Sequence, residues 1–442
     1  MRIAASDSLF VSATPRKPSH GEHNQSPVRT SFLLQASKGS RHRTTANRQV
    51  HSIRAALITN PDDFEVGRFV GSYGFMNITS YSSFQAGGIS NVSGLQEFTP
   101  DYSSEDIERL RVQDVGEGQV KIRLYEGRVT QGTLKGTRVI FKVYPGQRAG
   151  GIEADMMAAN ELSTHAFIQS DSRNICQNIQ FLLGGFETKT GEQWLAFRDD
   201  GKYSAADYAK VMSETISKNL AKGEQKFWNP FDQEQKLKRR RFFVIKLLNG
   251  AMNGLAYMHH HDRLHQSLGP ASVVLNTIAE KDAAYLVPRL RDLAFSVDIG
   301  YSAIEAGPGA LSEGLWHRAS TAGAFTPLEK QAYGIADDIY EAGLLFAYLV
   351  FVPFCEAGIM DAISLQRLLE STFQLDLNAA REYCLADDRL LEAVKFLDLG
   401  DGAGWELLQM LFVSQAMLNP DYRQRPIAEA VLRHRFMTGA IL

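Results

Sequence analysis

The sequence has few of the residues that build metal centres or disulfide frameworks. The three cysteines of the 442-residue chain are Cys176, Cys355 and Cys384. No two of them have the close spacing of a metal-binding pair, so we expect reduced thiols. Long apolar runs are also scarce. The apolar stretch 343–363 is broken by Pro353 and Glu356 and is too short to cross a bilayer, so we expect no integral membrane span.

The N-terminal segment is poor in acidic residues. Residues 1–54 contain nine Lys or Arg but only Asp7 and Glu22, with many Ser and Thr and no secretory-type apolar core. This composition is typical of an organellar transit peptide, and residues 53–56 resemble a chloroplast cleavage pattern. We therefore expect residues 1–55 to be a disordered transit peptide, and the protein to be chloroplastic, stromal or thylakoid-associated. Mitochondrial import is one alternative. A basic tail that binds nucleic acid or an anionic surface is another.

Without that segment the chain is acidic. Removing residues 1–54 leaves 38 basic and 48 acidic residues, a net charge of −10. Such a chain is a poor generic binder of nucleic acid, so we expect no nucleic-acid partner. Its length and ordinary hydrophobic content allow a large core and predict two to three domains.

A region with a clear strand pattern follows a region without one. Residues 57–115 suggest short strands or ordered loops, without recognisable chemistry. Residues 119–144 alternate in period two and are rich in β-branched and aromatic side chains, which predicts two or three strands. Gly127, Val129 and Gly132 form a G-x-V-x-x-G run, and Lys142 follows in an apolar strand.

A second group of motifs lies in the middle of the chain. His265, Leu268 and Pro270 match the pattern H-R-D-L-K-P-x-N. Ser267 stands at the position of the Asp in that pattern, and Ser272 at the position of the Asn.

Four further segments follow in order. Asp292 lies in a degraded D-F-G segment, and Glu329 in a degraded A-P-E. Asp338 lies in the well-preserved run Y-G-I-A-D-D-I-Y, where it is expected to cap the following helix and to hold the preceding loop by hydrogen bonds. Arg423 and Arg425 belong to the segment 419–436, where one of them would form a buried pair with Glu329.

Together these segments resemble the eukaryotic protein kinase superfamily over about 70% of the chain. The resemblance implies an α+β, bilobal protein-kinase-like fold over residues 116–437. A β-rich N-lobe would span about 116–197 and a mainly helical C-lobe about 198–437. Residues 56–115 would be an N-terminal extension of unknown role. The segment 300–324 would be a loop.

The resemblance also implies a site for ATP and Mg²⁺. The implied nucleotide-binding residues are Gly127, Val129, Lys142, Glu161, Ala196 and Asp292. Lys142 would pair with Glu161, for which Glu153 is the rival, and Asp292 would hold the metal. Ala196 would lie near the hinge that binds adenine. The implied structural residues are His265, Asp338, Glu329, Arg423 and Arg425.

The substitutions bear on catalysis. Ser267 carries no charge and is a poor base at neutral pH, and the loss of the Asn at Ser272 weakens a second metal position. The sequence therefore favours a pseudokinase that retains ATP binding and acts as a scaffold or regulator of a protein partner. The alternative is a divergent active Ser/Thr kinase that uses Asp262 as its base and phosphorylates protein substrates. A metabolic phosphotransferase is disfavoured by the kinase-like ending of the chain.

A polar stretch separates these two groups of motifs. Residues 213–241 include the basic run Lys236 to Arg241. This run is either the solvated start of a helix or an electrostatic docking patch for an acidic partner.

Overall fold

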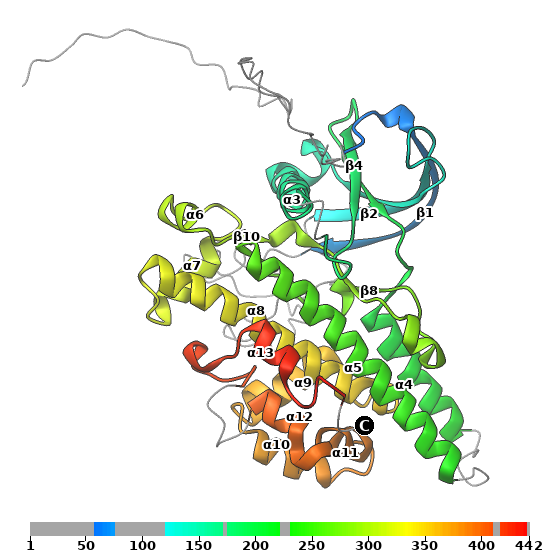
Figure 1. Ribbon diagram of the computed structural model, residues 1–442, viewed down its shortest axis with the longest axis vertical. Helices are drawn as coiled ribbons and strands as arrows, with labels where there is room; N and C mark the ends of the chain where they lie inside the picture. Colours follow the sequence, from blue (N-terminus) through cyan, green and yellow to red (C-terminus); the bar gives the residue numbers. More distant parts are fainter. Residues whose placement is uncertain (1–56, 76–119, 171–174, 222–229, 410–415, 440–442) are drawn as a thin grey trace, which may run out of the picture. The chain divides into compact units, whose positions relative to one another are not determined.

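The computed structural model describes residues 57–75, 120–170, 175–221, 230–409 and 416–439. The predicted transit peptide lies outside the described residues, as does most of the predicted extension. The described part is a mixed α+β structure, as the sequence predicted, with a five-stranded antiparallel sheet, two small sheets and a larger set of helices (Figure 1).

The sheet has five strands in the order β1-β2-β3-β5-β4. Their bounds are β1 (Phe64–Phe75), β2 (Val120–Val129), β3 (Arg138–Tyr144), β4 (Leu182–Glu187) and β5 (Gln193–Arg198). Strands β2 and β3 are the two that the alternating pattern predicted. The turn between them contains Gly132 and Gly136, whose φ values of 74° and 87° favour glycine.

Strand β1 changes the expected domain boundary. It pairs antiparallel with β2, with Phe64 opposite Val129 and Tyr73 opposite Ile122. Ile58 also bridges Gly184 of β4. The boundary predicted near residue 116 is therefore wrong, because residues 57–75 belong to the same sheet as β2.

The two faces of the sheet have different coverings. Helix α3 (Gln147–Ile168) covers one face, where Ile122 and Tyr144 pack with Met157. On the opposite face Phe141 and Val143 belong to a second buried cluster. Because side chains alternate along a strand, Lys142 points to the α3 side, between Phe141 and Val143.

The rest of the described chain is mainly helical. The α-helices are α4 (Ala205–Ala221), α5 (Pro230–His260), α6 (Tyr301–Glu305), α7 (Glu313–Thr321), α8 (Pro327–Phe351), α9 (Ala362–Arg367), α10 (Leu377–Leu385), α11 (Leu391–Leu397), α12 (Leu399–Gln409) and α13 (Ala428–Arg433). The segment 300–324, expected as a loop, thus contains α6 and α7. Its short helices bury Ile304, Leu315 and Trp316, which the segment's small and polar residues concealed.

Short elements connect these helices. The strands are β6 (Tyr203–Ser204), β7 (Arg263–Leu264), β8 (Val273–Leu275), β9 (Arg289–Leu290) and β10 (Val297–Asp298). The short 3-10 and π-helices are η1 (Pro61–Asp63), η3 (Pro270–Ser272), η4 (Glu280–Tyr285), η5 (Leu293–Phe295), η6 (Val352–Phe354), η7 (Leu368–Thr372) and η8 (Tyr422–Gln424).

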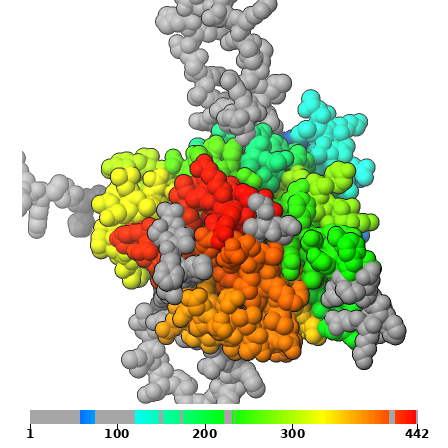
Figure 2. Space-filling view, turned by 60° about the horizontal axis from the view of Figure 1, so that its bottom comes forward, coloured from blue at the N-terminus to red at the C-terminus, as the bar shows by residue number. Residues whose placement is uncertain are grey.

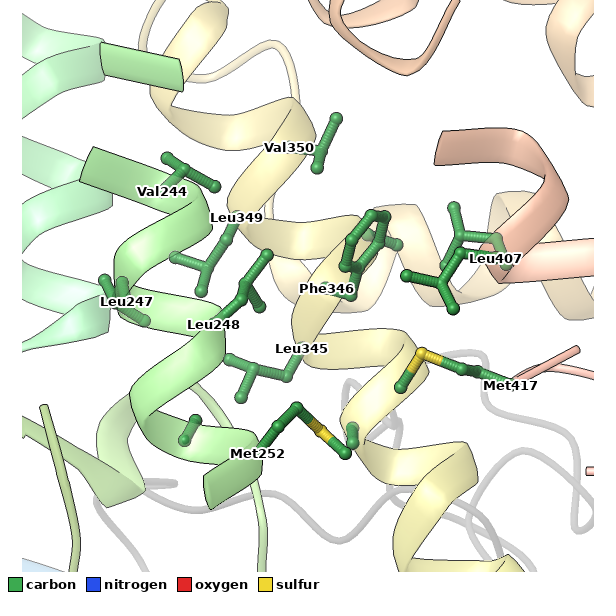
Figure 3. Close-up of a cluster of buried hydrophobic side chains, with 14 of the residues drawn as sticks. Val244, Leu247, Leu248, Met252, Leu345, Phe346, Leu349, Val350, Leu407 and Met417 are labelled. Atoms are coloured by element: carbon green, nitrogen blue, oxygen red, sulfur yellow. The ribbon is translucent and has the colours of Figure 1, made fainter. Parts of the chain in front are cut away.

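Helix α8 is the centre of the helical core. Figure 3 shows Leu248 and Met252 of α5 facing Leu345 of α8, while Phe346 faces Leu407 on the other side. In Figure 2 the orange surface of α10 to α12 lies beside the red segment 416–439. Among the described residues no helix is both long and apolar enough to span a bilayer.

Candidate functional site

Three charged side chains from distant parts of the sequence meet beside α3. Lys142 of β3 donates through Nζ to both carboxylate oxygens of Glu161 on α3, at 2.8 and 2.6 Å. The same Nζ donates to Oδ1 of Asp292 at 2.8 Å. All three residues are at most 3% exposed. The pairing of Lys142 with Glu161, rather than with Glu153, was predicted from the sequence and is present.

The charges in this cluster compensate one another. Arg291 Nε lies 3.1 Å from Oδ2 of Asp292, so two cations face two carboxylates. Burial acts to lower the pKa of Lys142, but Asp292 and Glu161 outweigh it and hold this pKa well above its ordinary value. Burial likewise acts to raise the pKa of Asp292, yet Lys142 and Arg291 bring it down to about 2. Lys142 and Asp292 are therefore both charged at neutral pH.

Aromatic side chains surround the ammonium group. Tyr73, near the end of β1, donates its hydroxyl to Oδ1 of Asp292 at 2.9 Å. Tyr144 donates to Oε2 of Glu161. The rings of Tyr73, Tyr144 and Phe197 lie 5.6–5.9 Å from Lys142 Nζ. We call Lys142, Glu161, Arg291, Asp292, Tyr73 and Tyr144 the buried cluster.

Sequence reasoning missed Tyr73, Tyr144 and Arg291. Tyr144 and Arg291 each lie within two residues of a motif residue, Lys142 or Asp292, and this proximity was their only signal in the sequence. Tyr73 carried no such signal, because β1 meets β2 only in the folded chain.

The buried cluster does not fit Mg²⁺ in this arrangement. Oδ1 of Asp292 already accepts from Lys142 and Tyr73, and Oδ2 forms an ion pair with Arg291. In the described part of the chain, no three His, Cys, Asp or Glu side chains come together as a metal site. A hard cation needs several oxygen ligands, so it would have to displace these donors.

Three predicted nucleotide contacts lie on the wrong side of the sheet. A Cβ on Gly127 would meet the ring of Phe141 and the carbonyl oxygen of Glu65, at 2.4 and 2.5 Å. Val129 and Ala196 belong to the same buried cluster as Phe141. That cluster covers the face opposite Lys142.

Ala196 is also excluded as a backbone contact at a hinge. It lies inside β5, opposite Phe141 of β3 on one side and Gly184 of β4 on the other. The run from Gly127 to Gly132 was assigned to nucleotide binding, but it lies in β2 and the turn to β3. The connection from β1 to β2 is a different segment, residues 76–119, which lies outside the described residues.

The serines of the loop are engaged with backbone groups. Ser267 is 5% exposed and donates from Oγ to the carbonyl oxygen of Asp292 at 2.8 Å. Ser272 is fully buried, and its Oγ bonds the N–H and the carbonyl oxygen of Gly269 at 2.9 and 2.8 Å. Ser267 thus holds the backbone at Asp292, and Ser272 closes a local turn.

Asp338 holds this loop in place, as predicted. Its carboxylate accepts from the backbone N–H groups of His265 and Gln266, at 2.8 and 2.9 Å. His259 Nε2 lies 2.9 Å from the same carboxylate. The other half of the prediction is wrong, because Asp338 lies inside α8 and the helix cap is Thr326.

His265 is fully buried in the same loop. Its Nε2 lies 3.1 Å from the carbonyl oxygen of Arg291, which links the loop to the buried cluster. Burial lowers its pKa, although Asp338 and Asp292 oppose the shift. The imidazole is therefore neutral near pH 7, in agreement with a structural role.

The rival base, Asp262, lies elsewhere. It is exposed at the end of α5, with a φ of 52°, and its Oδ1 accepts from Gln331 Nε2 at 3.3 Å. Gln331 belongs to the first turns of α8. The structure therefore does not bring the Asp262 carboxylate together with Ser267 or Asp292.

The predicted buried pair of Glu329 with an arginine does not form. Glu329 accepts from the backbone N–H groups of Phe325 and Thr326 in the capping box of α8. Arg423 donates to the carbonyl oxygen of Gly323 at 3.3 Å. Capping satisfies the Glu329 carboxylate locally, which removes its need for a distant cation.

Arg425 instead braces the helix. It donates to the carbonyl oxygens of Asn419 and Ala336, at 2.8 and 3.0 Å, and lies over the ring of Tyr340. It therefore ties the C-terminal segment to α8, a structural role without the predicted partner.

No protein-family model matches this sequence, and no curated protein matches it either. We therefore interpret the site from its own geometry and from the resemblance of its motifs.

Proposed function

We propose that the chain has a bilobal, protein-kinase-like fold and works as a pseudokinase, a scaffold or regulator that binds a protein partner without transferring phosphate. The observation that carries the proposal is the bonding of Lys142 to both Glu161 and Asp292, 19 and 150 residues away in sequence. In protein kinases a strand lysine pairs with a helix glutamate beside a metal-binding Asp. The hydrogen bonds that the Asp338 carboxylate accepts from the loop of His265 add support.

The absence of phosphotransfer follows from the loop chemistry. A kinase positions its nucleophile with a carboxylate that accepts the proton of the substrate hydroxyl. Ser267 stands at that position in the motif, and its hydroxyl is already a donor to the backbone of Asp292. Asp262 faces Gln331 and does not replace it.

Nucleotide binding in this proposal requires an opening of the buried cluster. ATP and Mg²⁺ would have to displace Tyr73 from Asp292 and compete with Glu161 for Lys142. We propose that the arrangement described here is the resting state, in which the regulator works without nucleotide. Lys142, Glu161 and Asp292 remain the residues that would hold nucleotide phosphates and metal after opening.

The proposed location is the chloroplast, in the stroma or at the thylakoid surface, with mitochondria as the alternative. The support is the basic, acid-poor composition of residues 1–54. Fusion of residues 1–59 to a fluorescent reporter tests it, and a diffuse cytosolic signal would contradict it.

A phosphotransfer assay tests the central proposal. Wild type and Asp292→Asn are incubated with radiolabelled ATP, Mg²⁺ and generic protein substrates, and autophosphorylation is measured in parallel. Both proteins should incorporate no phosphate above background, because Ser267 cannot act as the base. Asp298→Asn, at an exposed carboxylate, is the matched control.

Robust transfer by wild type that Asp292→Asn abolishes and Asp298→Asn retains would overturn the pseudokinase proposal. The divergent Ser/Thr kinase would then replace it, and loss of activity in Asp262→Asn would identify the base.

A further inference from the structure

A groove lies between the first half of α5 and the short helix η4. It has a volume of about 590 Å³ and is lined by Lys238, Arg239, Phe242, Glu280, Lys281, Ala283 and Ala284. The basic run that the sequence analysis singled out therefore supplies one rim of a concave surface. We call this surface the basic groove.

The floor of the basic groove is apolar. Phe242 is 48% exposed although it follows a charged run, and the next residue, Phe243, is fully buried. Ala283 and Ala284 form the facing wall. An exposed aromatic ring in a concavity is a frequent anchor point for a partner side chain.

The rim carries cations that the described residues do not neutralise. Arg239 and Lys281 are exposed and make no ion pair with any of the described residues. Lys238 has only the exposed Glu234, one helical turn away at 3.6 Å, a pairing of little energetic weight. The groove is therefore positive in a chain whose formal net charge is −3.

Among the described residues that line the groove, the one carboxylate is already bound. Glu280 Oε1 accepts from Arg240 Nε at 2.7 Å and from the Tyr208 hydroxyl at 3.2 Å. Arg240 thereby compensates the charge of Glu280, so Glu280 does not neutralise the cations on the rim.

The walls of the groove are fixed to each other. Lys246 donates to the carbonyl oxygen of Ala284, which ties η4 to α5. Asn276 bonds the carbonyl oxygen of Tyr285 and the N–H of Val287, both at 2.9 Å, and braces η4 from the other end. A preformed groove binds a flexible peptide at a lower entropic cost than one that must be assembled.

We infer that the basic groove binds an acidic peptide segment of a protein partner, with an apolar side chain of that segment on Phe242 and its carboxylates on Lys238, Arg239 and Lys281. A bare phosphate would leave the apolar floor exposed to water. Nucleic acid needs a longer basic track and is opposed by the overall negative charge of the chain.

This inference names the chemistry of the partner and so rests on the proposed function, but its test involves no ATP. Failure of the peptide to bind would leave the phosphotransfer result unchanged, and phosphotransfer by wild type would leave the peptide result unchanged.

The test measures fluorescence anisotropy of labelled peptides titrated with the full chain. The probe is the octapeptide Asp-Glu-Asp-Phe-Leu-Asp-Glu-Asp, with Asp-Glu-Asp-Gly-Ser-Asp-Glu-Asp as its counterpart without apolar residues. We expect a Kd on the order of 10–100 μM for the first probe. Binding of the second should be about tenfold weaker, because it cannot use the apolar floor.

Two variants locate the binding. Lys238→Glu combined with Arg239→Glu should weaken the first probe by at least about tenfold, and Phe242→Ala by about tenfold. The matched control is Lys135→Glu with Lys189→Glu, which changes the net charge equally at exposed turns of the sheet and should leave the Kd within about twofold.

Three outcomes would overturn the inference. One is the absence of binding of the first probe up to about 1 mM. Another is an equal loss in the control variant, which would show non-specific attraction. The third is tighter binding of an eight-nucleotide poly-U strand that the Lys238 and Arg239 reversals abolish, which would make the groove a nucleic-acid site.

Discussion

The buried cluster and the basic groove treat charge in opposite ways. In the buried cluster Lys142 and Arg291 are matched by Glu161 and Asp292, and tyrosine hydroxyls take further positions on the carboxylates. In the basic groove Arg239 and Lys281 face solvent without a described anionic partner. A set of charges that is internally satisfied stabilises one arrangement of the chain, whereas unsatisfied charges remain available to another molecule.

The comparison also shows that lysines in the two regions have different roles. Lys142 lies in an apolar strand and is needed by the fold, because two buried carboxylates depend on it. Lys238 lies on an exposed helix face, where water can solvate it. The same residue type therefore predicts a large effect on stability in one place and almost none in the other.

The largest expected effect is that of Lys142→Met. This substitution leaves Glu161 and Asp292 buried side by side with one cation fewer, which should lower the free energy of unfolding by about 3–5 kcal/mol. Urea denaturation followed by circular dichroism measures the change. Lys135→Met, on an exposed turn, is the control and should change stability by less than about 0.5 kcal/mol.

If Lys142→Met lowers the free energy of unfolding no more than its control does, the buried cluster does not depend on its lysine, and the contrast with the basic groove is wrong. Adding Glu161→Gln should restore part of the stability, since it removes the carboxylate whose described ion pair is with Lys142, whereas Asp292 still faces Arg291.

The next effect concerns acid stability. His165 on α3 is fully buried, and burial together with the charge of Lys142 lowers its pKa from 6.5 to about 3. The unfolded chain therefore binds a proton that the folded chain does not, between pH 6.5 and pH 3. Folding stability should fall as the pH drops through this window, by about 2 kcal/mol between pH 7 and pH 5.

Denaturation of wild type and His165→Leu at both pH values checks this expectation. The variant should lose less stability on acidification than wild type. The loss that remains in the variant should include a contribution from His265, whose pKa is also lowered. Equal losses in the two proteins would refute the assignment to His165. Asp292 does not contribute in this range, because its stabilisation is lost only as the pH falls below about 3.8 towards 2.

Tyr73→Phe tests how much one tyrosine hydroxyl contributes to the buried cluster. Loss of the hydroxyl removes a hydrogen bond to a charged carboxylate and should cost about 1.5 kcal/mol of stability. It should also remove one of the donors that Mg²⁺ would have to displace from Asp292, so ATP with Mg²⁺ should raise the melting temperature of the variant more than that of wild type. Tyr125→Phe, on the opposite face of the sheet, is the control. A larger nucleotide shift in wild type than in Tyr73→Phe would contradict the role of Tyr73.

Local motifs predicted the centre of the candidate site but not its surroundings. Lys142 and Asp292 were recognisable because each is fixed by a few neighbours in sequence. Tyr73 was not, because its position depends on the pairing of β1 with β2 across residues 76–119. Long-range strand pairing leaves little trace in a single sequence. Gly127 and Val129 were misassigned for the converse reason, since a glycine followed by valine fits any hairpin.

The helical part shows the same limit. Asp338 was predicted to bond the loop backbone, and the hydrogen bonds to His265 and Gln266 are present. The pair between Glu329 and an arginine was not formed, because Glu329 is satisfied by its own helix cap. A short-range capping contact needs no chain closure, and therefore outcompetes a distant ion pair of uncertain geometry.

The smallest expected effect is on the stability of the basic groove variants. Lys238→Glu with Arg239→Glu should change the free energy of unfolding by less than about 0.5 kcal/mol, because both side chains are exposed and their only described ion pair is the weak one with Glu234. Urea denaturation of this variant and of Lys142→Met measures the contrast directly.

A loss of unfolding free energy above about 2 kcal/mol would mean that these cations stabilise the folded structure, as Lys142 does, and the groove would then not differ from the buried cluster. Unchanged stability together with loss of the acidic peptide would instead assign these charges to recognition, because a substitution that spares the fold can abolish binding only by altering the surface that the peptide contacts.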